Sequence, residues 1–203
     1  MSLRTKLRPR HALVPVTAAA VTLGAFALAP GSSATQAQDH RSKAPKSVSW
    51  QKELRQALPT LGHRNWIVVA DSAYPRQTSA GVRTLTTGAD QTEVVKEVVA
   101  QLGKQQHVKA HVQVDKEMKY VPEKSAPGIT SYRDGLDQVL KGQETEPVLH
   151  EELIKKLDEA GEKFQVIVLK TDLTLPYTSV FFELDAKYWD ADREAELREL
   201  MKS

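Results

Sequence analysis

The chain has 203 residues, of which 40% are hydrophobic and 27% are charged, and it contains no cysteine. With 28 Lys and Arg against 26 Asp and Glu, its formal net charge is only +2. The absence of cysteine excludes a lipid anchor attached through a thiol. The near balance of charge argues against nucleic acid or an anionic membrane as a partner, because such partners are bound by a clustered basic face.

Residues 1–37 have the order of a secretory signal peptide, with four basic residues, then an apolar stretch, then small and polar residues. We expect cleavage after Ala37; cleavage after Ala34 also fits, and an uncleaved membrane anchor at residues 12–30 is the alternative. Cleavage leaves 203 − 37 = 166 residues with 24 basic and 26 acidic side chains. The sequence thus predicts a periplasmic or extracellular protein without membrane attachment, in which residues 38–48 are a flexible leader.

The following chain alternates between helical and strand patterns. A short amphipathic helix is expected from Trp50 to about Leu61, followed by a strand at residues 66–71 that is buried on both faces. After a strand at residues 82–87 comes the clearest helix, at residues 90–102, which Asp90 begins as a cap. The later elements expected are a strand at 107–115, a helix at 129–140, a helix at 148–160 with Pro147 in its first turn, strands at 163–171 and 177–184, and a charged helix at 190–202.

This alternation predicts one α/β domain at residues 49–189, with α/β/α layers in which helices cover a mixed sheet. Residues 190–203 are expected to form a helical extension. A chain of this size buries roughly 70% of its unfolded surface, so it needs neither disulfides nor a structural metal.

Common catalytic and cofactor motifs are missing. There is no phosphate-binding loop, no dinucleotide glycine fingerprint, no G-x-S-x-G elbow and no H-E-x-x-H. No pair of histidines lies at i,i+4 spacing on a predicted helix. The usual cofactor and hydrolase signatures are therefore missing, although counting histidines does not exclude a metal site.

His63 and Asp71 stand before and after the buried strand, at positions where ligands collect in α/β sheets. Extended chain between them spans roughly 25 Å, so they meet only if the chain turns at residues 62–66 or if a neighbouring subunit brings them together. The alternative is structural, with Asp71 as a loop cap and His63 as a cation at a helix end.

The segment LGHRNWIVVADSAYP (61–75) resembles the G-H-x-D-x-[ILV]-x-[ILV]-x-D-x-x-[FLY]-P motif of the RbsD/FucU family, the ribose pyranases and fucose mutarotases. Gly62, His63, Asp71 and Pro75 match it with the spacing intact. Residues 84–102 and 108–118 are similar to the family's next helix and strand. Residues 170–184 (KTDLTLPYTSVFFEL) are similar to its last motif, [RT]-T-G-E-x-x-P-Y-x-N-[IV]-[IL]-L, and place Tyr177 on the family's tyrosine.

Several positions depart from the family pattern. Asn65 stands in place of an aspartate, Thr171-Asp172-Leu173 in place of T-G-E, and Ser179 in place of an asparagine. A further polar site residue of the family corresponds to His150 if five residues are inserted, or to Lys155 by ungapped counting.

The resemblance implies an RbsD-like fold and a cofactor-independent isomerase that opens and recloses the ring of a free ribose- or fucose-like monosaccharide. In that reading His63, Asp71 and Tyr177 are catalytic, while Ser179 and either His150 or Lys155 bind the sugar. Histidine suits proton transfer in both directions because its pKa is about 6.5. The resemblance also implies a homo-oligomer with sites at subunit boundaries.

Two other functions stay open on the sequence alone. A non-catalytic exported sugar-binding or transport-accessory protein could use the same pocket, and the replaced asparagine and T-G-E favour it. An exported hydrolase would need a nucleophile or a pair of carboxylates, and no such pair stands out by spacing.

Overall fold

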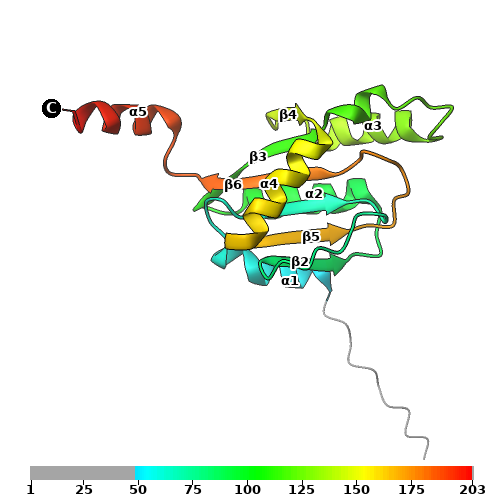
Figure 1. Ribbon diagram of the computed structural model, residues 1–203, viewed down its shortest axis with the longest axis horizontal. Coiled ribbons are helices and arrows are strands. Elements are labelled where there is room, and N and C mark those ends of the chain that lie inside the picture. Colours follow the sequence, from blue (N-terminus) through cyan, green and yellow to red (C-terminus); the bar gives the residue numbers. More distant parts are fainter. Residues whose placement is uncertain (1–48, 203) are drawn as a thin grey trace, which may run out of the picture. The chain divides into compact units, whose positions relative to one another are not determined.

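The computed structural model describes residues 49–202 of the chain. The predicted signal peptide and the predicted leader both lie outside these residues. Figure 1 shows the order of the elements. They are α1 (Trp50–Ala57), the 3₁₀ helix η1 (Leu58–Thr60), β1 (Trp66–Ala70), β2 (Val82–Thr86), α2 (Gln91–Gly103), β3 (Val108–Asp115), the 3₁₀ helix η2 (Lys116–Tyr120), α3 (Ile129–Val139), β4 (Thr145–Val148), α4 (His150–Lys163), β5 (Val166–Lys170), β6 (Val180–Ala186) and α5 (Ala191–Leu200).

One mixed sheet has the strand order β2-β5-β1-β6-β3-β4. β1 runs parallel to β5 and antiparallel to β6, and β6 is also antiparallel to β3. Because β2 is parallel to β5 and β4 is parallel to β3, all strands except β6 end at the same edge of the sheet. We call this the carboxyl edge.

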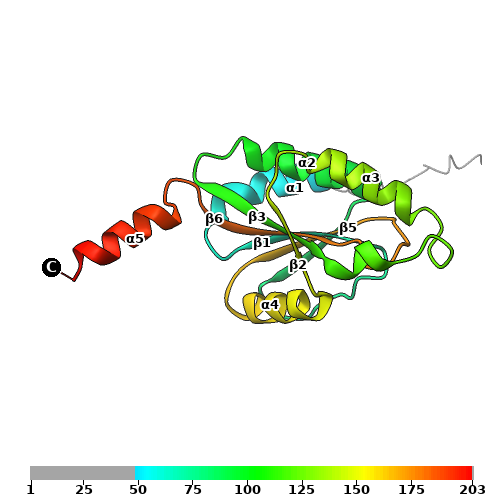
Figure 2. The same ribbon diagram turned by 90° about the horizontal axis from the view of Figure 1, so that it is seen from above.

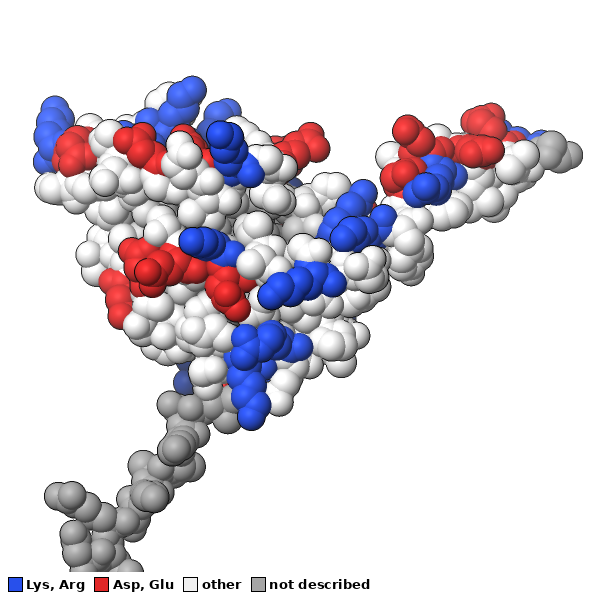
Figure 3. All heavy atoms as spheres, turned by 180° about the vertical axis from the view of Figure 1, so that it is seen from behind, with Lys and Arg blue, Asp and Glu red and all other residues white. Residues whose placement is uncertain are grey.

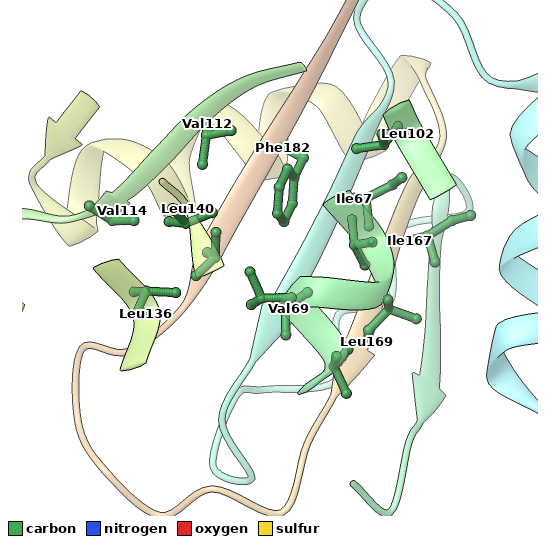
Figure 4. Packing of buried hydrophobic residues seen from close by; sticks show 14 of the residues in the cluster. Ile67, Val69, Leu102, Val112, Val114, Leu136, Leu140, Ile167, Leu169 and Phe182 are labelled. Carbon is green, nitrogen blue, oxygen red and sulfur yellow. The ribbon is translucent and has the colours of Figure 1, made fainter. Parts of the chain in front are cut away.

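The helices lie on both faces of the sheet, with α1, α2 and α3 on one side and α4 on the other (Figure 2). Alternate residues of β1 serve the two faces: Ile67 and Val69 pack under α1–α3, whereas Val68 packs against α4. Figure 4 shows the first of these layers, where Leu102 and Leu136 of α2 and α3 pack on the sheet. Full burial of such a side chain stabilises the fold by roughly 1.5–3 kcal/mol.

Local signals explain where the helices begin. Asp90 accepts hydrogen bonds from the backbone N–H groups of Thr92 (2.8 Å) and Glu93 (3.2 Å) and so caps α2. α4 lacks a cap of its own, and the carboxylate of Glu117, after β3, accepts from the N–H of His150 at 3.1 and 3.2 Å. The end of β3 therefore fixes the start of α4.

Two glycines allow α4 to approach the sheet closely. The N–H of Gly81, before β2, donates to the carbonyl of Gly161 in α4 at 3.1 Å. A Cβ at Gly81 would lie 2.2 Å from the carbonyl oxygen of Phe164, and one at Gly161 would lie 2.6 Å from Cγ2 of Val82. Neither position has room for a side chain.

The predicted α/β class with α/β/α layers and a mixed sheet is confirmed. The predicted helical turn around Pro147 is wrong, because Pro147 belongs to β4 and α4 begins only at His150. β4 is an edge strand, where the missing N–H of proline is tolerated. The predicted charged helix is present as α5, which buries none of its residues.

Acidic and basic side chains are interspersed on the face formed by α1–α3 (Figure 3). In residues 49–202, no helix combines the length and the apolar character that crossing a membrane requires.

Candidate functional site

The carboxyl edge gathers ionisable and hydroxyl side chains from strands that are distant in sequence. Asp71 follows β1, Asp115 ends β3, and His150 begins α4 directly after β4. Tyr177 and Ser179 reach the same edge from the other direction, because β6 begins there, with Val180 paired to Val69 and Val114. Polar groups at this edge are therefore brought together by topology.

His150 is the centre of the closest set of contacts. Its Nδ1 lies 2.9 Å from Oδ1 of Asp115, and its ring meets the ring of Tyr177 edge-on with centroids 5.5 Å apart. The hydrogen bond to Asp115 raises the pKa of His150 above its ordinary value, and burial of the imidazole opposes this effect. The side chain of His150 remains 29% exposed, so the charged ring can still reach a ligand.

Asp115 is the buried member of this pair, with a fully covered side chain. Burial raises the pKa of Asp115, and the hydrogen bond with His150 opposes that rise. Within residues 49–202 its second oxygen, Oδ2, has no hydrogen-bond partner, and neither has the buried hydroxyl of Tyr74. Burial also raises the pKa of Tyr74, which keeps the phenol protonated.

Tyr177 has an unusual backbone for a bulky residue, with a φ of 55° in the left-handed region. This conformation costs a non-glycine residue roughly 1–2 kcal/mol and is found mostly where the surrounding structure enforces it. Tyr177 is 43% exposed at the carboxyl edge. The strain therefore presents an aromatic ring to solvent beside His150.

A buried polar network holds the loop before Tyr177 and the residue after it. Gln91, fully buried at the start of α2, accepts from the hydroxyl of Thr171 at 2.8 Å and donates to the carbonyl of Thr178. The hydroxyl of Tyr132 in α3 donates to the same carbonyl at 2.7 Å. Side chains of α2 and α3 thus hold the two ends of the loop between β5 and β6.

The other predicted residues of this edge differ in what they expose. Asp71 accepts a hydrogen bond from the N–H of Ala73 at 2.7 Å, a loop-capping contact, and is partly exposed. Ser179 lies at this edge but is only 1% exposed, so its hydroxyl is covered by the protein. Of the two candidates for the further polar residue, His150 touches Tyr177, whereas Lys155 is exposed on α4 and makes no hydrogen bond or ion pair with the described residues.

His63 lies at the other end of the strands, opposite the carboxyl edge. Its Nδ1 is 2.7 Å from Oδ1 of Asp185 near the end of β6, and His111 of β3 reaches Oδ2 of the same carboxylate at 3.4 Å. Burial would raise the pKa of Asp185, but the hydrogen bonds from His63, the Ala186 N–H and His111 outweigh burial and lower it. Within one copy of the chain, His63 and Asp71 do not form a joint site.

No group of three or more His, Cys, Asp and Glu side chains in residues 49–202 is arranged to hold a metal ion. The side chains of His150, Asp115, Asp71 and Tyr177 at the carboxyl edge can transfer protons and form hydrogen bonds.

The family model for the RbsD / FucU transport protein family matches residues 46–184, well over half of the chain. The chain belongs to the RbsD/FucU family. No curated protein is significantly similar to it in sequence.

Solved structures of this family have low identity to the chain. They include Bacillus subtilis RbsD complexed with D-ribose (21% identity, TM-score 0.45) and the fucose mutarotase of Streptococcus pneumoniae in complex with L-fucose (18%, TM-score 0.45). Each comparison covers 70% of this chain and 98% of the solved one. FucU from Bifidobacterium longum is 13% identical, with a TM-score of 0.42 and the same coverage.

Sequence reasoning missed Asp115, Gln91 and Tyr74. Asp115 could have been found, because it ends a predicted strand and the ends of parallel strands share an edge. Gln91 gives no local signal, because a glutamine in the first turn of a helix is usually solvated. In this structure Gln91 is 0% exposed.

Proposed function

We propose that this protein is a monosaccharide mutarotase or pyranase that opens and recloses the ring of a free sugar without a cofactor. The observation that carries the proposal is the convergence of His150, Asp115 and Tyr177 at the carboxyl edge of a chain that belongs to the RbsD/FucU family. An imidazole beside a tyrosine at an open edge suits acid/base work on a sugar.

The reaction requires two proton transfers. A base takes the proton of the anomeric hydroxyl while an acid protonates the ring oxygen, the bond between the anomeric carbon and the ring oxygen breaks, and an aldehyde and a hydroxyl result. Rotation about the freed carbon bond and the reverse transfers close the other anomer or ring size. A histidine supplies either role near neutral pH.

In the proposed site, His150 is one of the two acid/base groups. The neighbouring Asp115 favours its protonated form, which suits it to protonate the ring oxygen. Tyr177 contacts the sugar. Asp71 positions the sugar through the carboxylate oxygen that does not accept from the N–H of Ala73.

His63 is proposed as the second acid/base group, donated by a second copy of the chain. It lies at the far edge of its own sheet, so it reaches a carboxyl edge only across a subunit boundary. The proposed protein is therefore a homo-oligomer with shared sites. We also propose that residues 1–37 are removed as a signal peptide and that the protein is exported.

A binding protein without turnover is the second candidate. The burial of Ser179, in place of the family's asparagine, favours it because a single polar contact to the sugar is lost. Such a protein would hold a sugar at the same edge and leave the rate of exchange unchanged.

Magnetisation-transfer NMR on ribose, fucose and other free sugars distinguishes the two candidates. The parent protein should exceed the spontaneous exchange rate, and His63→Ala, His150→Ala and Asp71→Asn should each lower the rate on the order of 10² to 10⁴. Lys155→Ala is the matched control and should keep the parent rate. Binding without any acceleration by the parent protein would establish the second candidate and end the mutarotase proposal.

A further inference from the structure

A pocket of about 660 Å³ lies beside His63. One wall comes from the end of the sheet, with His63, Lys109 and His111, and the other comes from residues 185–194. The family match ends at residue 184, so the second wall belongs to the C-terminal segment of this chain. We call this hollow the His63 pocket; its volume is in the range of small-molecule sites.

Trp189 is the most distinctive residue of the second wall. It is 39% exposed, whereas Trp50 and Trp66 are 8% and 3% exposed in the core. Tyr188 beside it is 70% exposed. An indole that leaves apolar surface in a pocket is a contact surface for a ligand rather than a part of the core.

The indole of Trp189 is held in place by α5. Its Nε1 donates to Oε2 of Glu194 at 2.7 Å, and Nε of Arg198 donates to Oε1 of the same carboxylate at 2.7 Å. The polar atom of the indole is thereby satisfied, so the surface that Trp189 leaves exposed is apolar. α5, which has no buried residue, serves as a support for this ring.

Directional polar groups stand on the opposite wall. His63 uses Nδ1 on Asp185, and its Nε2 has no partner among the described residues, while its side chain is 63% exposed. The charges around the pocket are of both signs, with Lys109 facing Asp185, Asp190 and Glu194. This combination suits a neutral ligand with one apolar face and a rim of hydroxyls, and it disfavours an anion.

We propose that the His63 pocket takes the apolar face of the sugar against Trp189, and that Trp189 is a specificity-determining residue of this protein. The proposal rests on the proposed function, since it takes His63 to reach the sugar. A 6-deoxyhexose presents a methyl group and a face of C–H bonds to the indole, whereas a pentose presents less apolar surface. The pocket therefore favours 6-deoxyhexoses over pentoses.

The test uses the full chain and its Trp189→Ala, Trp189→Phe and Leu197→Ala variants. Leu197 has the same exposed fraction as Trp189, 39%, and does not line the pocket, so Leu197→Ala controls for loss of exposed apolar surface. Magnetisation transfer gives the concentration of L-fucose and of D-ribose at half-maximal exchange. Acrylamide quenching of tryptophan fluorescence gives a second readout, with Trp189→Phe as the reference for the two buried indoles.

We expect L-fucose to protect Trp189 from acrylamide. Trp189→Ala should raise the half-maximal concentration of L-fucose about tenfold, and that of D-ribose less, because roughly two methylene equivalents of contact are lost. Trp189→Phe and Leu197→Ala should stay within about twofold of the parent.

The outcomes separate the two proposals. Accelerated exchange with no protection of Trp189 and an unchanged Trp189→Ala would overturn the pocket and leave the mutarotase standing. Protection of Trp189 without acceleration would support the pocket and overturn the mutarotase. Neither protection nor acceleration with any sugar would overturn both.

Discussion

His63 and Asp71 lie at opposite ends of β1, His63 bonded to Asp185 at one edge of the sheet and Asp71 bonded to its own loop at the other. The strand between them spans about 16 Å at 3.3 Å per residue. A site that needs both side chains is therefore made by two copies of the chain or is not made at all.

Mixing two inactive variants tests this relationship. His63→Ala and Asp71→Asn should each be inactive alone, and coexpressed in equal amounts they should regain about a quarter of the parent activity, because random assembly in a symmetric oligomer restores that share of shared sites. Exchange rates by magnetisation transfer and size by light scattering are the measurements. The double variant mixed with the parent protein is the control. No recovery from a mixture shown to be oligomeric would argue that the two residues do not act at one site.

Asp115→Asn tests the carboxylate behind His150. The substitution keeps the shape but removes the charge that favours the imidazolium, so the pKa of His150 should fall toward about 6.5. An NMR titration of the imidazole Cε1 proton measures it. Asp158→Asn, an exposed aspartate bonded to Gln77, is the matched control and should leave the titration of His150 in place. An unchanged pKa in Asp115→Asn would mean that the hydrogen bond does not govern His150.

The same pair predicts how stability changes with pH. The folded-state pKa of His150 is raised, so its contribution is fully present below about 6.5 and is lost as the pH rises through the folded-state pKa. The raised pKa of Asp115 acts in the same direction at lower pH, because the folded state again binds the extra proton. Thermal unfolding from pH 5 to 9 should show the parent losing stability relative to His150→Ala. Parallel curves for the two proteins would contradict the prediction.

Tyr132→Phe tests the support of the β5–β6 loop. It removes the hydroxyl that donates to the carbonyl of Thr178 and accepts from Nε2 of Gln91, and it should lower the free energy of unfolding by about 1–3 kcal/mol, since each of these two hydrogen bonds contributes about 0.5–1.5 kcal/mol net. Urea unfolding measures the change. Tyr120→Phe, in which the altered side chain is 70% exposed, should be neutral. Equal stability of both variants would show that Gln91 alone holds the loop.

Tyr177→Gly should separate stability from function. Glycine adopts a φ of 55° without strain, so the variant should gain about 1 kcal/mol of stability while losing the ring beside His150 and with it sugar exchange. Tyr177→Phe keeps both the strain and the ring and should retain the parent stability. A less stable glycine variant would mean that the contacts of the tyrosine outweigh its backbone strain.

Most of the fold is predictable because its signals are local. The apolar run of β1 and the cap at Asp90 each define an element within about a dozen residues, and both are present as predicted. β4 was missed because its residues are exposed up to Val148 and include Pro147, which leaves no strand pattern.

The site is less predictable than the fold because its contacts join distant residues. Asp115 and His150 are 35 residues apart, and the hydrogen bond between them depends on the parallel pairing of β3 with β4. The choice between His150 and Lys155 had no answer in the sequence either, since only the start of α4 decides which side chain faces Tyr177.

The contact between Gly81 and Gly161 ties remote positions to the chemistry of the carboxyl edge. α4 behaves as a rod about 16 Å long between Gly161 and His150, at 1.5 Å per residue. A methyl group at Gly161 would push the C-terminal part of α4 away from β2. The imidazole of His150, at the N-terminal end of α4, would then move away from Asp115. A substitution at position 161, which contacts no sugar, would therefore remove the proton donor from the site. Position 161 is thus restricted to glycine as strictly as the site residues at the carboxyl edge are restricted to their own residue types.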